Sequence, residues 1–115
     1  MKLKPVLPSL RERKRYVTFE VLSEKSVSDG GAVAKAIWNS MLRFGGELGT
    51  SEAGLIVLID QYKASSQRGI VRVAHTGVDK LKASFTFITS ISGIPVTIRS
   101  VAVSGNINKA KTSRK

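Results

Sequence analysis

Residues 54–74, GLIVLIDQYKASSQRGIVRVA, decide the fold because they contain two strand-like runs separated by a polar segment. Residues 54–60 form a continuous apolar run of strand length, which predicts a strand covered on both faces. Residues 61–68 are polar, and residues 70–74 are again rich in β-branched side chains. The whole stretch is therefore expected to fold as a β-hairpin.

A strand followed by a helix is predicted on the N-terminal side of this hairpin. Residues 16–22 alternate between apolar and polar side chains, which is typical of a strand with one buried face. Ser28-Asp29 offers an N-cap, and apolar residues then recur at helical spacing until Gly45-Gly46, where the helix should end in a loop over 47–53. The residues expected to face the core are Val17, Phe19, Val21, Val33, Ile37, Met41 and Phe44.

A helix followed by a strand is predicted on the C-terminal side. Thr76 with Asp79 fits the capping-box pattern, and Gly93 and Pro95 are expected to end the helix. Its inner stripe should consist of Val78, Leu81, Phe85 and Ile88. The apolar run 96–103 completes the order β-α-β-β-α-β. This order is typical of an α+β, ferredoxin-like (RRM-like) sandwich, a four-stranded antiparallel sheet with both helices on one face and the first and third strands in its centre.

The charge is concentrated at the two ends of the chain. The formal net charge is +11, of which residues 1–15 carry +5 and residues 105–115 carry +4, whereas residues 16–104 carry only +2. The expected organisation is a basic N-terminal arm, a domain over 16–104, and a basic C-terminal tail. Basic ends on a nearly neutral domain favour a polyanionic partner over a merely solubilising role, because each neutralised phosphate releases counterions.

The two basic ends are expected to differ in rigidity. Ser9 with Glu12 fits a capping box, so the arm is interpreted either as a short helix or as a frayed segment. The arm is tethered next to the first strand, whereas the tail is expected to be loose and to lose more entropy when it docks on phosphate. The N-terminal cluster should therefore contribute more to function than Lys109, Lys111, Arg114 and Lys115.

Few residues offer catalytic or metal-binding chemistry. The chain has no cysteine and one histidine, His75, for which packing or capping is the ordinary interpretation. Asp29-Gly30-Gly31 could hold an anion at a helix start, but no Gly-Lys-Ser/Thr follows, so a capped helix start is favoured. The absence of a long apolar run predicts a cytoplasmic protein without a membrane span.

The third predicted strand invites comparison with RNA-recognition domains. Residues 68–75, RGIVRVAH, begin like the RNP1 signature but lack its aromatic residues, so base stacking on the sheet is not expected. By alternation, Ile70, Arg72, Arg99 and Val101 should share the face turned away from the helices. Such a mixed apolar and cationic face could bind a protein partner or a structured RNA. The alternative is a half-exposed sheet face with two solvated arginines and no partner. Trp38 is expected in the core, with an interface anchor as the alternative.

Three stretches together resemble the archaeal ribonuclease P protein component 2 family, the counterpart of a eukaryotic subunit shared by ribonucleases P and MRP. They are PSLRERKRYVTFE (8–20), AGLIVLID (53–60) and GIVRVAH (69–75), and their order and spacing carry the resemblance over about residues 8–104.

The resemblance implies a non-catalytic, RNA-binding subunit that assists a catalytic RNA, with its magnesium, in removing the 5′ leader of precursor tRNA. Its implied partners are ribonuclease P RNA, the barrel-like protein component 3, a second copy of itself and, indirectly, precursor tRNA. A ferredoxin-like dimerisation or ligand-sensing module and a ribosomal-type RNA-binding protein remain as alternatives. The residues expected to bind RNA are Arg11, Arg13, Lys14, Arg15, Arg68, Arg72, Arg99, Lys109 and Lys111.

Overall fold

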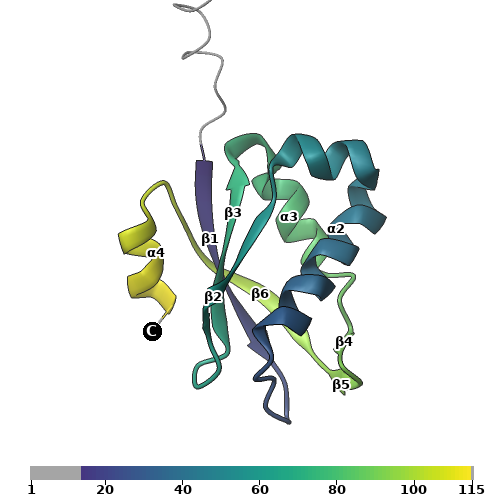
Figure 1. The fold of residues 1–115 in the computed structure, drawn as a ribbon, viewed down its shortest axis with the longest axis vertical. Coiled ribbons are helices and arrows are strands. Elements are labelled where there is room, and N and C mark those ends of the chain that lie inside the picture. Colours follow the sequence, from purple (N-terminus) through teal and green to yellow (C-terminus); the bar gives the residue numbers. More distant parts are fainter. Residues whose placement is uncertain (1–13, 115) are drawn as a thin grey trace, which may run out of the picture.

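A computed structural model describes residues 14–114 of the chain, without the side chains of 47–53 and 114 (Figure 1). The proposed capping box at Ser9 and Glu12 lies outside the described residues. The main elements, in chain order, are β1 (Lys14–Leu22), α2 (Gly30–Ala53), β2 (Ile56–Lys63), β3 (Arg68–Ala74), η1 (His75–Gly77), α3 (Val78–Phe85), β4 (Ser90–Ile91), β5 (Ile94–Pro95), β6 (Thr97–Ser104) and α4 (Ile107–Arg114).

The four long strands form one antiparallel sheet in the order β2-β3-β1-β6. The predicted ferredoxin-like fold and the central position of the first and third strands are confirmed. The register between β1 and β6 shifts between Thr18 and Phe19, which pair with Ala102 and Ser100. Val101 lies between the two registers at this bulge. The bulge interrupts the alternation of side chains along β6, so alternation does not place Val101 on the same face of the sheet as Arg99.

The core lies between the sheet and the helices α2 and α3, which cover the same face (Figure 1). Alternate residues of β1 enter it, because successive side chains of a strand point to opposite faces. Val17, Phe19 and Val21 are at most 2% exposed, as the sequence predicts. Val33, Ile37 and Met41 meet them from α2, and Leu81 and Phe85 from α3.

A third helix, α4, covers the opposite face of the sheet, where the sequence predicts a loose basic tail (Figure 1). It packs against β1, β3 and β6 and buries Ala110. The Thr18 hydroxyl donates a hydrogen bond to the Ala110 carbonyl at 3.2 Å, and Arg68 donates one to the Ser113 carbonyl at 3.0 Å. Ile70, which faces away from the main core, is completely buried. The prediction of a loose tail is therefore wrong.

The helix α2 begins where the sequence predicts but extends further. Asp29 Oδ1 accepts hydrogen bonds from the amides of Gly31 and Ala32 at 2.9 and 3.3 Å, so these amides serve a capped helix start rather than an anion site. At Gly46 the backbone leaves helical geometry (φ 73°, ψ 175°), and helical backbone resumes as far as Ala53. The glycines thus kink the helix, and the predicted loop over 47–53 is wrong.

The helix that precedes β6 is shorter than the sequence predicts. The helix α3 ends at Phe85, and its N-cap position is occupied by Gly77, which has no side chain to cap it. Ile88 nevertheless remains buried, below the short hairpin β4–β5. Ser92 and Gly93 both have positive φ, as a tight hairpin turn requires.

Three predictions of burial are wrong because the side chains lie at the margins of the fold. The strand β2 is an edge strand, and its Ile56 and Ile59 are 44% and 52% exposed. Trp38 is 41% exposed on α2, and Phe44 is 42% exposed. None of the helices in the described part of the chain is long and apolar enough to cross a lipid bilayer.

Candidate nucleic-acid interface

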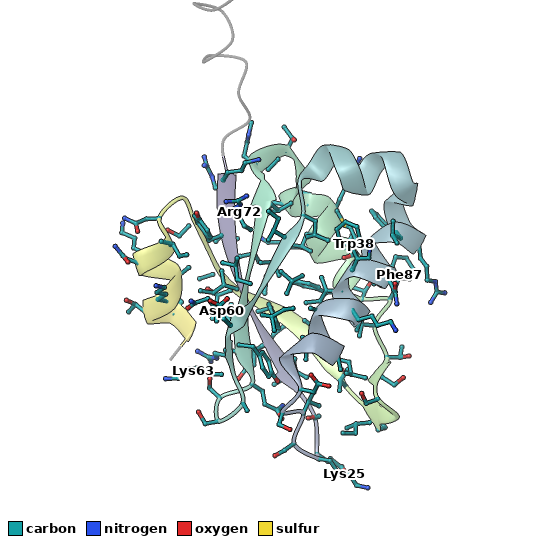
Figure 2. The ribbon with its side chains drawn as sticks, in the orientation of Figure 1. Lys25, Trp38, Asp60, Lys63, Arg72 and Phe87 are labelled. Carbon is teal, nitrogen blue, oxygen red and sulfur yellow. The ribbon has the colours of Figure 1, made fainter. Side chains whose placement is uncertain are left out.

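Basic side chains gather at the end of the sheet where β1 begins. Lys14 is exposed, and Arg15 is half-buried with its guanidinium hydrogen-bonded to the Lys14 carbonyl at 3.0 Å. Arg72 lies on the neighbouring strand at the same end, because Tyr16 pairs with Arg72 (Figure 2). Arg11 and Arg13 precede this group in the chain but lie outside the described residues.

Within the described residues, Arg72 has a buried donor atom without a partner. Its side chain is half-buried, and its Nε is buried without a hydrogen-bond partner among residues 14–114. An unsatisfied buried donor costs about 1–3 kcal/mol, so such an atom is seldom left without a reason. The sheet face that carries Arg72 is closed further along by α4, so the open cationic face predicted for Ile70, Arg72 and Arg99 is not present.

Arg68 and Arg99, which are also predicted to bind RNA, both form ion pairs with the carboxylate of Glu20. Arg99 Nη2 and Nε lie 2.6 and 2.8 Å from Glu20 Oε1, and Arg68 Nε lies 3.4 Å from Glu20 Oε2. The hydrogen bond from Arg99, aided by the charge of Arg68, lowers the pKa of Glu20 although burial opposes this. Arg68 also binds the last turn of α4, so its role within the fold is structural.

Replacing Glu20 with Gln is expected to lower stability by about 1 kcal/mol at neutral pH, because Arg99 is 53% exposed and solvent screens the pair. A carboxylate with a lowered folded-state pKa stabilises the fold above its unfolded pKa, and this contribution is lost as pH falls through the folded-state value. Melting midpoints measured from pH 7 to 3 should therefore fall more steeply in the native chain than in Glu20→Gln. Glu24→Gln, at an exposed glutamate, is the control and should keep the native slope.

The C-terminal cations occupy fixed positions on α4. Lys109 is exposed and Lys111 is half-buried. Because α4 is folded against the sheet, these two lysines do not carry the ordering cost that the sequence-based expectation gave to a loose tail.

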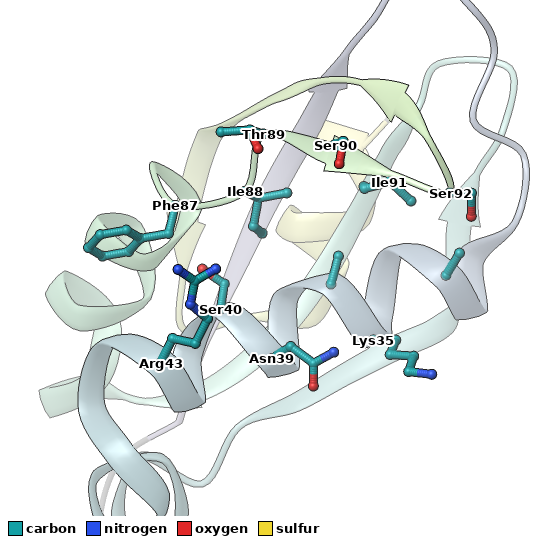
Figure 3. A pocket seen from close by; sticks show the side chains of 12 residues that line it. Lys35, Asn39, Ser40, Arg43, Phe87, Ile88, Thr89, Ser90, Ile91 and Ser92 are labelled. Carbon is teal, nitrogen blue, oxygen red and sulfur yellow. The ribbon is translucent and has the colours of Figure 1, made fainter.

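A groove that the sequence did not reveal runs along the other side of the molecule, between α2 and residues 87–92 (Figure 3). It has a volume of about 360 Å³. Lys35, Asn39 and Arg43 follow one another along its α2 wall at four-residue spacing, and Phe87 stands at one end. The four-residue spacing shows in the sequence that these side chains share one helix face. The opposite wall of the groove is formed only in the tertiary fold, so the sequence alone does not indicate a groove.

The described residues offer no evident metal or acid–base cluster. Within residues 14–114, no three His, Cys, Asp or Glu side chains lie together as metal ligands would. His75 is exposed in η1, so of the two expected roles packing is wrong, whereas capping stays a prediction.

Comparisons with known proteins point in one direction. The model of the Rpp14/Pop5 family matches residues 15–114. Curated proteins named ribonuclease P protein component 2 are similar to the chain: that of Pyrococcus furiosus is 35% identical over 108 residues, covering 94% of this chain and 88% of the relative. The protein from Methanosarcina mazei is 34% identical, covering 94% and 89%.

The fold also has a counterpart in a solved structure. A chain in the cryo-EM structure of yeast ribonuclease MRP superposes with a TM-score of 0.62, covering 84% of this chain and 77% of that one. The two sequences are 16% identical, so this likeness concerns the fold alone.

Proposed function

Because the chain belongs to the Rpp14/Pop5 family, we propose that it is an RNA-binding protein subunit of ribonuclease P that assists a catalytic RNA in removing the 5′ leader from precursor tRNA. The observation that carries this proposal is the similarity of nearly the whole chain to archaeal proteins named ribonuclease P protein component 2. The net charge of +11 supports an RNA partner.

The proposed contribution of the protein is electrostatic. Lys14, Arg15 and Arg72 lie at one end of the sheet, directly after the basic residues of the N-terminal arm. Cations held on a folded body allow RNA segments to approach one another with less repulsion between phosphates. The RNA would hold the magnesium of the reaction, and the protein would stabilise the RNA conformation that does so.

We propose protein partners as well, namely the barrel-like protein component 3 and a second copy of the chain. Two exposed apolar regions are available for such contacts. One is Trp38 on α2, and the other is the unpaired edge of β2 with Ile56 and Ile59. A half-exposed tryptophan is a common anchor of protein interfaces, and an unpaired strand edge can accept a partner strand.

Reconstituted cleavage of precursor tRNA tests the function. A variant with Arg11, Arg13, Lys14 and Arg15 changed to Gln should need more magnesium and show a shallower salt dependence, because fewer phosphate contacts remain to be screened. Changing Lys109 and Lys111 to Gln is the comparison. It should have the smaller effect, because it removes two charges rather than four.

The same assay contains the outcomes that would contradict the proposal. The chain alone should not cleave precursor tRNA, and turnover by the purified protein that survives removal of RNA would overturn the assisting role. Unaltered magnesium and salt dependence in both variants would remove the two clusters from the RNA-contacting surface.

A further inference from the structure

The groove between α2 and residues 87–92 has a composition that core packing does not require (Figure 3). Its twelve lining residues include two cations, Lys35 and Arg43, and no Asp or Glu. The wall opposite α2 carries the hydroxyl groups of Thr89, Ser90 and Ser92. A groove with cations on one wall and hydroxyl donors on the other is complementary to an anionic ligand with many acceptor oxygens.

An exposed aromatic ring stands at the end of this groove. Phe87 is 46% exposed, whereas the neighbouring Ile88 and Ile91 are 6% and 3% exposed and supply the local contribution to the core. Phe44 holds the Phe87 ring from one side, with centroids 5.6 Å apart and planes tilted by 42°. Phe87 is therefore a supported ring with free surface at the same end of the groove as the cation Arg43 (Figure 3), and a ring combined with positive charge is what sequence-tolerant single-strand binders use.

The sheet does not offer an equivalent platform. The helix α4 covers the face on which RNA-recognition domains stack bases, and Thr18 and Ile70 beneath it are completely buried. A second hollow, of about 600 Å³ between residues 22–25 and 93–97, is lined by Glu24 and Lys25 and by no aromatic residue. The hollow therefore lacks a ring, and the ring that lies beside a cation on the sheet, Tyr16 opposite Arg72, is half-buried.

We propose that the α2 groove binds a single-stranded segment of RNA, with a base stacked on Phe87 and phosphates next to Lys35 and Arg43. The hydroxyl groups of Thr89, Ser90 and Ser92 would donate to phosphate or ribose oxygens. The segment is unpaired because the faces of bases inside a duplex are already stacked and cannot reach the ring. This inference rests on the proposed RNA-binding function and assigns it a second surface, separate from the β1 end of the sheet.

Fluorescence anisotropy of the full chain with a fluorescein-labelled oligouridylate of about ten nucleotides tests the site, since a small domain covers roughly 4–16 nucleotides. Phe87→Leu should weaken binding about tenfold, as expected for the loss of one base-stacking contact. Arg43→Gln should weaken it several-fold, and the salt slope should fall by about one, because one phosphate contact is lost.

Two matched controls separate the groove from general effects. Val103→Ala removes an apolar side chain of similar exposure that does not line the groove, and Lys25→Gln removes an exposed cation outside it. Both should bind the oligouridylate as the native chain does. Melting curves of all variants check folding, and if Phe87→Leu fails to fold, Arg43→Gln decides, because Arg43 is exposed.

Each alternative outcome has a distinct meaning. Native affinity in both groove variants would overturn the inference. Binding of a hairpin RNA but not of the oligouridylate would also overturn it while leaving the proposed function intact. Failure to bind either RNA, together with no effect on reconstituted cleavage, would defeat the proposed function itself. Groove variants that bind RNA normally but no longer assemble with protein component 3 would make the groove a protein surface, contrary to the inference.

Discussion

Deleting residues 106–115 is expected to lower the melting midpoint by about 10 °C or more and to reduce the solubility of the chain. The deletion removes α4 and exposes Ile70, whose burial contributes about 2 kcal/mol. It also removes the backbone acceptors of Thr18 and Arg68, each of these hydrogen bonds contributing about 1 kcal/mol. For a domain of this size, a loss of 1 kcal/mol shifts the midpoint by about 4–8 °C.

The control for this deletion keeps the helix and removes two of its three positive charges. Changing Lys109 and Lys111 to Gln leaves Ala110 and the two hydrogen-bonded carbonyls in place. Thermal melts followed by circular dichroism should show nearly native stability for this variant. A truncated chain that melts at the native temperature would mean that α4 rests on the sheet without stabilising it.

Replacing Gly69 with Ala is expected to destabilise the fold by about 2 kcal/mol, within the usual range for overpacking a core. A Cβ at this position would lie 2.6 Å from Phe19 Cζ and 3.1 Å from Tyr62 Cδ1. Phe19 is 1% exposed and stacks against Tyr62, whose hydroxyl is hydrogen-bonded to the Val27 carbonyl at 2.6 Å. Phe19 is fully enclosed, and the hydrogen bond to Val27 holds the half-buried Tyr62 ring in place.

Gly45→Ala is the matched control for this overpacking. A Cβ at Gly45 meets nothing within 4 Å, and alanine favours a helical backbone by about 0.5–1 kcal/mol over glycine. Urea denaturation should therefore give opposite signs for the two substitutions. Equal stability of Gly69→Ala and the native chain would show that the Phe19 and Tyr62 rings can move apart.

The order of strands and helices was predictable because each element carries its own periodicity. Residues 16–22 alternate, and Val33, Ile37 and Met41 recur at helical spacing, so the ferredoxin-like topology followed from local patterns. The apolar run 54–60 was correctly identified as a strand, but its composition could not say which elements would cover it. The strand lies at the edge of the sheet, where Ile56 and Ile59 remain accessible.

The helix α4 was missed because its stability comes from tertiary contacts. Residues 107–114 are polar apart from Ile107 and Ala110, so they have no apolar stripe. What holds them is the far face of the sheet, which exists only after β1 and β3 have paired. The same reason hid the pairing of Glu20 with Arg68 and Arg99, since both partners lie opposite Glu20 only in the final strand register.

The sequence identifies the basic residues of the candidate site, but it indicates only in part where the fold places their side chains. Lys14 and Lys109 are exposed, as an RNA-contacting role requires, whereas Arg68 is used within the fold. The groove beside Phe87 was not predicted, because Arg43 lies on α2 and Phe87 lies in the turn after α3, and only the tertiary fold brings them together.

The pairing of β1 with β6 sets the order of events during synthesis. Of the four strands in the sheet, β1 leaves the ribosome first and β6 last, and the hydrogen bond from Thr18 reaches residue Ala110. Contacts that are so distant in the chain form late, because a long loop must close before they stabilise anything. Until β6 arrives, one edge of β1 stays open to other chains. The nascent protein is therefore most prone to misassociation between the emergence of β1 and that of β6, and slow decoding of the codons for β6 would prolong that interval.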